Sequence, residues 1–202
     1  MLVRIAVLVS GGGTNLQALI DAQKSGALKS GKLALVVSNN PGAYALTRAK
    51  EDGIPAEIIE GADFESKLLE ILRGNGIDII VLAGFMRILS TEFTAKYPRR
   101  ILNVHPSLIP SFCGRGFYGL RVHRAALEYG VKLTGATVHF VNEIPDGGEI
   151  IMQKAVEVID GDTPETLQRR VMEEAEWAIL PAAAERICAE MVKNQVQKGM
   201  SN

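Results

Sequence analysis

Short, continuous apolar segments recur through the first half of the chain and limit the folds that it can adopt. The clearest lie at 2–9, 33–38, 79–83 and 101–104, with helix-forming segments between them. A strand that is apolar at every position, and not only at alternate positions, is typical of a sheet covered on both faces. Repeated strand–helix units of this length predict an α/β fold with a doubly wound, mostly parallel sheet.

The second half of the chain follows a different pattern. The segment 106–119 is rich in proline and glycine, which predicts a loop. Alternating residues at 137–142 and a strand at 149–158 predict an antiparallel C-terminal portion. From Thr163 onward, apolar residues at helical spacing predict a long C-terminal helix, which Pro181 should kink or break.

Composition and charge narrow the possible functions. The chain has 202 residues, of which 47% are hydrophobic, so it is long enough to bury a core as a single domain over 1–202. The net charge of −1 provides no broad basic surface for nucleic acid. No apolar run is long enough to span a membrane, and Cys113 and Cys188 have neither disulfide nor metal-ligand spacing. We therefore expect a cytoplasmic protein that binds small molecules.

A glycine-rich loop follows the first predicted strand. Residues 10–15 read Ser-Gly-Gly-Gly-Thr-Asn, and free N–H groups at the start of the next helix favour an anion. Leu16 stands where a dinucleotide fingerprint has its third glycine, and no lysine completes a P-loop. The loop therefore predicts a site for a phosphate monoester. Its expected residues are Gly11, Gly12, Gly13, Thr14 and Asn15. A tight turn capped by Thr14 is the structural alternative.

Three polar residues of the second half suggest acyl-transfer chemistry. Asn103 and His105 lie two residues apart at the end of a predicted parallel strand, where open α/β sheets bind ligands. Asp146 precedes two glycines in a predicted turn. An amide can donate to an oxyanion, an imidazole can move a proton, and a carboxylate can orient the imidazole. We call these three residues the catalytic trio, and their meeting in space is a hypothesis.

The other reactive side chains have simpler interpretations. His123 is expected to be solvated, and His139 to be packed and hydrogen-bonded on its strand. A metal site formed by His105, His139 and Asp146 is conceivable, but the three lack the close spacing of metal ligands. Cys113 lies in the predicted loop without a motif that would make it a nucleophile. We therefore expect no metal.

Four motifs together resemble those of the folate-dependent formyltransferases, in particular the phosphoribosylglycinamide formyltransferases of purine synthesis. They are SGGGTNLQ at 10–17, LAGFMRILS at 82–90, LNVHPSLIP at 102–110 and VHFV to DGG at 138–148. The resemblance extends to about Pro181 and implies a Rossmann-like formyltransferase fold. It also implies an enzyme that moves the formyl group of 10-formyltetrahydrofolate to the amine of 5'-phosphoribosylglycinamide, also called glycinamide ribonucleotide.

The resemblance implies a role for each matched residue. Asn103 would donate to the oxyanion, and His105 would pass a proton to the leaving nitrogen as an imidazolium whose pKa Asp146 raises. Glu176 would contact the ribonucleotide, whose phosphate would lie at the glycine loop. Lys67 stands where the family typically has an arginine for the folate. The residues expected to contact the folate are Lys67, Met86, Arg87, Ile88, Leu89, Asn103, Glu143, Ile144 and Pro145.

The resemblance leaves several points open. It divides the single domain into a phosphate-binding half, at about 1–100, and a folate and catalytic half, at about 80–192. Segment 111–118 is longer than in some members and could close over the site. One alternative is a formyltetrahydrofolate hydrolase-like enzyme or a methionyl-tRNA formyltransferase, although the phosphate loop favours a small phosphorylated substrate. A second alternative is a non-catalytic nucleotide-binding protein. A monomer and a homodimer are both compatible with the sequence.

Overall fold

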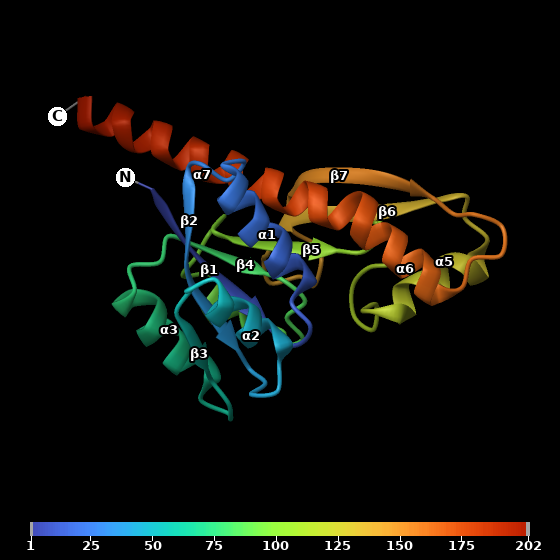
Figure 1. Ribbon diagram of the computed structural model, residues 1–202, viewed down its shortest axis with the longest axis horizontal. Coiled ribbons are helices and arrows are strands. Elements are labelled where there is room, and N and C mark those ends of the chain that lie inside the picture. Colours follow the sequence, from blue (N-terminus) through green and yellow to red (C-terminus); the bar gives the residue numbers. More distant parts are fainter. Residues whose placement is uncertain (1, 201–202) are drawn as a thin grey trace. The chain divides into compact units, whose positions relative to one another are not determined.

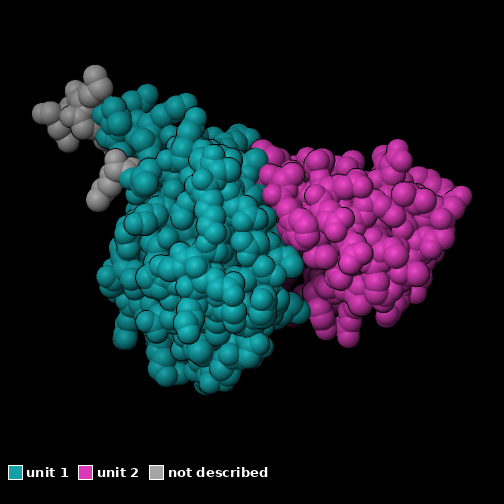
Figure 2. All heavy atoms as spheres, in the orientation of Figure 1, with its two compact units in different colours: residues 1–89, 181–202 teal, residues 90–180 magenta. Residues whose placement is uncertain are grey.

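The computed structural model describes the backbone of residues 2–200 and the side chains of residues 2–197. The chain forms two compact units (Figures 1 and 2). The first unit comprises residues 1–89 and 181–202, and the second comprises residues 90–180. Among the described residues, no helix combines the length and the apolar character that crossing a membrane requires.

The first unit is built from alternating strands and helices. Its strands pair in the order β3-β2-β1-β4, and every pair is parallel. Its elements before residue 89 are β1 (Val3–Val9), α1 (Thr14–Ser25), β2 (Gly31–Ser38), α2 (Tyr44–Glu51), β3 (Ala56–Ile58), α3 (Phe64–Gly74) and β4 (Ile79–Leu82). Parallel pairing in this order requires a crossover between neighbouring strands, and the helices provide it.

Buried side chains explain why these segments adopt their structures. Six of the seven residues of β1 are buried, as expected for a strand with helices on both faces. On α3, Phe64, Leu68 and Leu72 are four residues apart, so they form one apolar stripe, and all three are fully buried. The core of this unit therefore lies between its parallel strands and the apolar stripes of its helices.

Strand register places the glycine loop at the carboxyl edge of this unit. Val9 pairs with Ser38, and Leu8 pairs with Leu82, so the three strands end at the same edge. Directly after β1, the Ser10 hydroxyl donates to Asn39 Oδ1 at 2.7 Å and accepts from Met86 N at 2.9 Å. The ends of these three strands are thus tied together at the edge where α/β proteins bind ligands.

The second unit contains an antiparallel portion. Strand β6 pairs with β5 on one side and with β7 on the other, both antiparallel. Its elements are α4 (Thr91–Thr94), β5 (Ile101–His105), α5 (Leu120–Tyr129), β6 (Leu133–Phe140), β7 (Ile150–Glu157), α6 (Pro164–Val171) and a π-helical turn, η1 (Met172–Glu176). Helix α7 (Trp177–Met200) begins in this unit and continues in the first.

The predicted fold class is confirmed. The structure has parallel strand–helix units, an antiparallel portion in the second half and a long C-terminal helix. The expected break at Pro181 is absent, because α7 runs through this residue. Pro181 lies four residues after the start of α7, so the missing N–H costs only the bond to the Trp177 carbonyl. The irregular turn instead lies just before α7, at η1.

Candidate active site

Strands β5 and β6 place three polar side chains on one face. Asn103 and His105 are two residues apart on β5, so their side chains point to the same side. Asn103 pairs directly with His139 on β6, and directly paired residues share a face. This register sets an amide between two imidazoles at the carboxyl end of β5.

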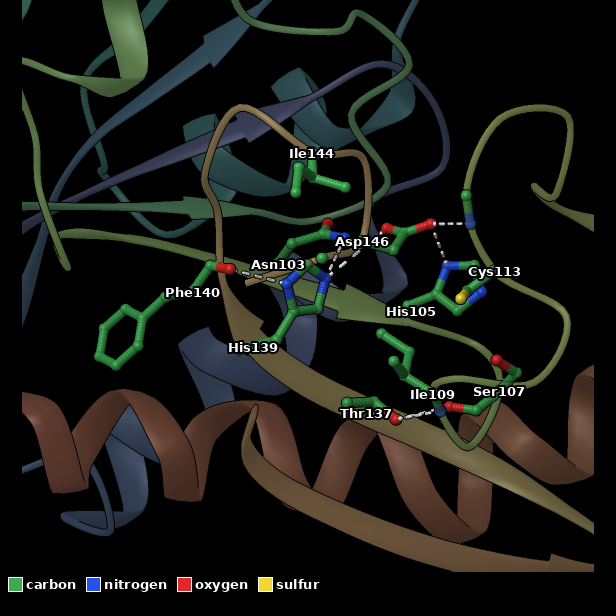
Figure 3. Close-up of polar contacts among 12 residues, drawn as sticks. Asn103, His105, Ser107, Ile109, Cys113, Thr137, His139, Phe140, Ile144 and Asp146 are labelled. Carbon is green, nitrogen blue, oxygen red and sulfur yellow. Dashed lines mark hydrogen bonds and ion pairs between the residues drawn. The ribbon is translucent and has the colours of Figure 1, made fainter. Parts of the chain in front are cut away.

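The loop between β6 and β7 brings Asp146 to these residues (Figure 3). Asp146 Oδ2 lies 3.5 Å from His105 Nδ1, and Oδ1 lies 3.6 Å from His139 Nε2. The backbone N–H of Gly114 donates to Oδ2 at 2.8 Å. The three residues of the catalytic trio therefore meet within the second unit.

Two glycines allow this loop to fold back tightly. A Cβ atom on Gly148 would lie 1.7 Å from the carbonyl oxygen of Phe140, and one on Gly147 would lie 2.5 Å from a methyl group of Ile144. Asp146 itself has a φ of 55°, a left-handed conformation that is uncommon outside glycine. The loop thus adopts a strained, close-packed path that directs the carboxylate of Asp146 toward the histidines.

His139 fixes the orientation of the Asn103 amide. Its Nδ1 lies 2.8 Å from the carbonyl oxygen of Phe140, which can only accept, so Nδ1 carries the hydrogen. In the neutral ring Nε2 is then an acceptor, and it lies 3.2 Å from Asn103 Nδ2. His139 is buried, as predicted, and it holds the amide nitrogen of Asn103 through one of its two hydrogens.

The segment 107–119 covers His105. The carbonyl oxygen of Phe112 lies 2.9 Å from His105 Nε2, so the two ring nitrogens of His105 face a carbonyl and a carboxylate. The Phe112 ring packs against Phe117 and Tyr129, with centroids 6.4 and 6.0 Å apart. These aromatic contacts hold the loop in the position that places the Phe112 carbonyl on His105.

Burial and hydrogen bonding act in opposite directions on the trio. Burial lowers the pKa of His105 below its ordinary value, although Asp146 and the Phe112 carbonyl both act to raise it. Burial acts to raise the pKa of Asp146, but His139 and His105 in their protonated forms and the Gly114 N–H outweigh it, so this pKa lies below its usual range. Burial therefore outweighs the rise in the pKa of His105 that the resemblance implies.

The glycine loop of the first unit has the form of an anion site. Gly13 is the N-cap of α1 with a φ of 72°, which favours glycine. Thr14 is the first residue of the helix, and the N-cap makes no side-chain cap hydrogen bond, so the alternative of a turn capped by Thr14 is wrong. The loop therefore presents backbone N–H groups at the N-terminus of a helix, where an anion is favoured.

The residues expected to contact the folate lie in both units. In the first unit, the side chains of Met86 and Ile88 are exposed, Leu89 is buried, and Lys67 pairs with Asp63 at 2.9 Å. Arg87 donates to the carbonyl oxygen of Gly61 at 3.0 Å and lies over the ring of Phe64.

In the second unit, the expected folate segment consists of Glu143, Ile144 and Pro145. The side chain of Ile144 is 57% exposed, so it offers apolar surface next to Asp146. Glu176, expected to contact the ribonucleotide, is buried at the end of η1, and π-helical turns are frequent at functional sites. Apolar side chains exposed in loops suit a flat aromatic ligand such as a pterin.

Known proteins with similar sequences share one family. A family model described as formyl transferase matches residues 3–183. The phosphoribosylglycinamide formyltransferase of Haemophilus influenzae is 42% identical over 184 residues, covering 88% of this chain and 84% of the relative. The chain belongs to the formyl transferase family.

Solved structures agree with this assignment. Glycinamide ribonucleotide transformylase 1 from Symbiobacterium toebii has a TM-score of 0.87 at 42% identity, covering 94% of this chain and 89% of that one. Other relatives are longer than this formyl transferase chain. The match covers 67% of the length of the chloroplastic phosphoribosylglycinamide formyltransferase of Arabidopsis thaliana, at 39% identity. It covers 19% of the length of a trifunctional purine biosynthetic protein of Gallus gallus, at 45% identity.

The expectation for His123 is wrong. This residue of the formyl transferase chain is fully buried on α5, beside Val122 and Ala126 on the same buried face. Neither ring nitrogen has a hydrogen-bond partner among the described residues. Burial, together with the charge of His105, lowers the pKa of His123 to about 4. The spacing of the helix face, which includes positions 122, 123 and 126, is the sequence signal that indicates this burial.

Cys113 and the histidines form no further reactive site in the described part of the chain. The Cys113 thiol donates to the carbonyl oxygen of Pro110 at 3.3 Å, and burial with the nearby Asp146 raises its pKa. A thiol with a raised pKa is a poor nucleophile. No group of three histidine, cysteine or acidic side chains among the described residues is arranged to hold a metal ion.

Proposed function

We propose that this formyl transferase moves the formyl group of 10-formyltetrahydrofolate to the amine of 5'-phosphoribosylglycinamide, in de novo purine biosynthesis. The products are N-formylglycinamide ribonucleotide and tetrahydrofolate. The convergence of Asn103, His105 and Asp146 carries the proposal, because acyl transfer needs an oxyanion donor and a proton carrier. Relatives whose names state this activity support the choice of substrates, because the present chain matches most of their length.

Asn103 supplies the oxyanion donor in this mechanism. His139 Nε2 takes one hydrogen of its amide nitrogen, which leaves the second hydrogen for the formyl oxygen as negative charge develops there. A donor that is already oriented needs no reorganisation during the reaction, which is why such groups contribute strongly to catalysis. Asn103 is thus proposed both to stabilise the oxyanion and to contact the formyl donor.

His105 moves the proton. The attacking amine must lose a proton, and the nitrogen that leaves the formyl group must gain one. The two ring nitrogens of His105 face Asp146 Oδ2 and the Phe112 carbonyl, so both N–H groups of the protonated ring have an acceptor. Asp146 and Phe112 therefore stabilise the imidazolium that forms when His105 takes up the proton, while burial favours the return to the neutral ring.

The two substrates have separate recognition elements in this proposal. Gly11 to Asn15 hold the phosphate of the ribonucleotide through backbone N–H groups, and Glu176 contacts its remainder. Met86 to Leu89 and Glu143 to Pro145 contact the pterin, and Lys67 contacts the folate. The phosphate-binding half, at about 1–100, and the folate and catalytic half, at about 80–192, then act as one formyltransferase domain.

The proposed reaction needs no partner beyond these two small molecules. We propose that it takes place in the cytoplasm, without nucleic acid or membrane, and that the protein acts as a monomer or a homodimer. No metal is required, since Asn103 and His105 supply the oxyanion donor and the proton carrier.

A hydrolase is the second candidate. A formyltetrahydrofolate deformylase from Pseudomonas syringae has a TM-score of 0.80 at 27% identity, and the match covers 62% of that chain. The same trio could therefore deliver the formyl group to water. The glycine loop favours the transferase, because a hydrolase of this kind needs no phosphate site for an acceptor. A non-catalytic nucleotide-binding protein would have no use for the trio.

One assay separates these three functions. The protein is mixed with 10-formyltetrahydrofolate, with and without 5'-phosphoribosylglycinamide, and the release of tetrahydrofolate is followed. We expect release only when the ribonucleotide is present. Release without the ribonucleotide would indicate the hydrolase, and no release in either mixture would indicate a binding protein. Either result would contradict the proposal.

A further inference from the structure

Four consecutive backbone carbonyl groups of the glycine loop each accept a hydrogen bond from another residue of the protein. The Ser10 carbonyl accepts from Asn40 Nδ2 at 3.1 Å, and the Gly13 carbonyl accepts from Gln17 N at 2.9 Å. Between them, the Gly11 carbonyl accepts from the backbone N–H of Ala45 at 3.1 Å, and the Gly12 carbonyl accepts from Arg48 Nε at 2.9 Å. Helix α2 therefore holds the two central carbonyls of the loop.

Holding the carbonyls orients the N–H groups. In a planar trans peptide the C=O and N–H bonds point in opposite directions, so a Gly12 carbonyl fixed on Arg48 turns the Gly13 N–H away from α2. The N–H groups of Gly11, Gly12 and Gly13 donate no hydrogen bond to any described residue. A Cβ atom built on Gly11 or Gly12 would meet no atom within 4 Å, so the loop has open space there.

Arg48 binds the loop with a rigid fork. While Nε donates to the Gly12 carbonyl, Nη1 donates to Gln17 Oε1 at 2.9 Å, so one guanidinium joins the loop to the first turns of α1. The ring of Tyr44 lies under this guanidinium at 5.1 Å. The planar guanidinium makes both bonds in a fixed geometry, which a lysine ammonium cannot reproduce.

The charge of Arg48 remains available to the loop. Arg48 is half-buried and forms no ion pair with a carboxylate among the described residues. A cation that bonds to a carbonyl polarises the whole peptide group, so the N–H on its other side becomes a stronger donor. The Gly12–Gly13 peptide therefore lies between a fixed cation and the expected position of the phosphate.

We propose that Arg48 is a positioning residue for the phosphate of the ribonucleotide. It acts through the Gly12–Gly13 peptide and does not touch the reacting atoms. This inference rests on the proposed function and adds a specific residue to it. The consequence is a defined division of effects: Arg48 affects the binding of a phosphorylated substrate and leaves the formyl-transfer step unchanged.

The test compares Arg48→Met and Arg48→Lys with the wild type, using 5'-phosphoribosylglycinamide and the same compound without its phosphate. With Arg48→Met, we expect the KM for the phosphorylated substrate to rise roughly tenfold or more, while kcat stays within about twofold. Arg48→Lys keeps the charge but not the fork, so its KM should fall between the two. The kcat/KM for the unphosphorylated compound should not change. Lys50→Met, which removes an exposed cation from the same helix, is the matched control.

Two results would overturn the inference. An unchanged KM for the phosphorylated substrate would mean that the loop does not need Arg48. An equal loss of kcat/KM for both compounds would mean that Arg48 only supports the fold. If the wild type transfers no formyl group, the proposed function fails, and calorimetric titration with ribose 5-phosphate tests Arg48 by itself. Weaker binding to Arg48→Met than to the wild type would then support the inference, and equal binding would overturn it.

Discussion

Asp146 shows how one residue can depend on the whole second unit for its role. The Gly114 N–H, which belongs to a different loop, donates a hydrogen bond to the Asp146 carboxylate. The left-handed backbone conformation of Asp146 itself directs this carboxylate toward the histidines. His105 and His139, the rings that it faces, come from two different strands. At the residue scale, the proposed chemistry therefore depends on a few contacts that individual substitutions can remove.

Asn103→Ala removes the proposed oxyanion donor. We expect kcat to fall by roughly 10²–10³, since this is the usual effect of losing one such donor, while the protein stays folded. Steady-state kinetics with both substrates at saturation measures the loss, and titration calorimetry measures their binding. Turnover close to that of the wild type would contradict the role given to Asn103.

Asp146→Asn tests the pairing with His105. Asp146 acts to raise the pKa of His105 against the effect of burial, so its removal should lower that pKa further. The acid limb of the pH–rate profile of kcat/KM reports the protonation of His105, and we expect it to move to lower pH. A profile with an unchanged acid limb would mean that Asp146 does not act on His105.

His123→Leu tests the burial of a neutral histidine. The pKa of His123 is about 4 in the folded protein and about 6.5 in an unfolded chain. Folding then favours the neutral ring, so wild-type stability is fully present above about pH 6.5 and falls as the pH drops toward 4. At pH 5 the free energy of unfolding is lower by on the order of 2 kcal/mol because of this residue, and His123→Leu should not show this decrease.

Denaturant unfolding at pH 7.5 and pH 5.0 measures the effect of His123→Leu. We expect the free energy of unfolding to fall less between the two pH values in the variant than in the wild type. Equal decreases in the two proteins would show that His123 is not a buried neutral group.

At the scale of the elements, the β6–β7 loop is the most demanding part of the second unit. Gly148 has no room for a Cβ atom, because the Phe140 carbonyl oxygen would lie only 1.7 Å from it. Gly148→Ala should therefore displace the loop and move Asp146 from His105, with a loss in kcat of roughly 10². Gly74→Ala is the control, since a Cβ atom on Gly74, at the end of α3, meets no atom within 4 Å. Similar kcat values in the two variants would contradict this account.

Elements that depend on local sequence could be predicted, and contacts that depend on packing could not. The buried strands can be recognised because nearly every position is apolar, as in β1, where Arg4 is the exception. Helix α4 has only four residues, too few for a periodic signal, and it was not predicted. The π-helical turn at η1 lies inside one continuous apolar pattern, so the sequence predicts a single helix there.

The candidate site follows the same division. The positions of Asn103 and His105 at the end of a strand follow from one apolar run, and the structure has them there. Asp146 reaches His105 only through the tight turn at Gly147 and Gly148, and this contact between distant residues has no local signal. The burial of His123, in contrast, has a local signal, since positions 122, 123 and 126 form one face of α5.

At the scale of the whole molecule, the two compact units carry different parts of the proposed reaction. The first unit contains the glycine loop with Arg48, and the second contains the trio. The same family also occurs in longer proteins, since this chain matches only about a fifth of the trifunctional purine biosynthetic proteins. The proposed formyl transfer therefore requires this chain to bind two substrates and to catalyse one reaction between them.

Tracing the formyl carbon tests the central claim most directly. The protein is incubated with 10-formyltetrahydrofolate labelled with ¹³C in its formyl group and with 5'-phosphoribosylglycinamide, and the products are identified by mass spectrometry. We predict that the label appears in N-formylglycinamide ribonucleotide, in equal amount to the tetrahydrofolate released. Label in formate, or no transfer of label to the ribonucleotide, would contradict the claim that this chain is a formyltransferase acting on that amine.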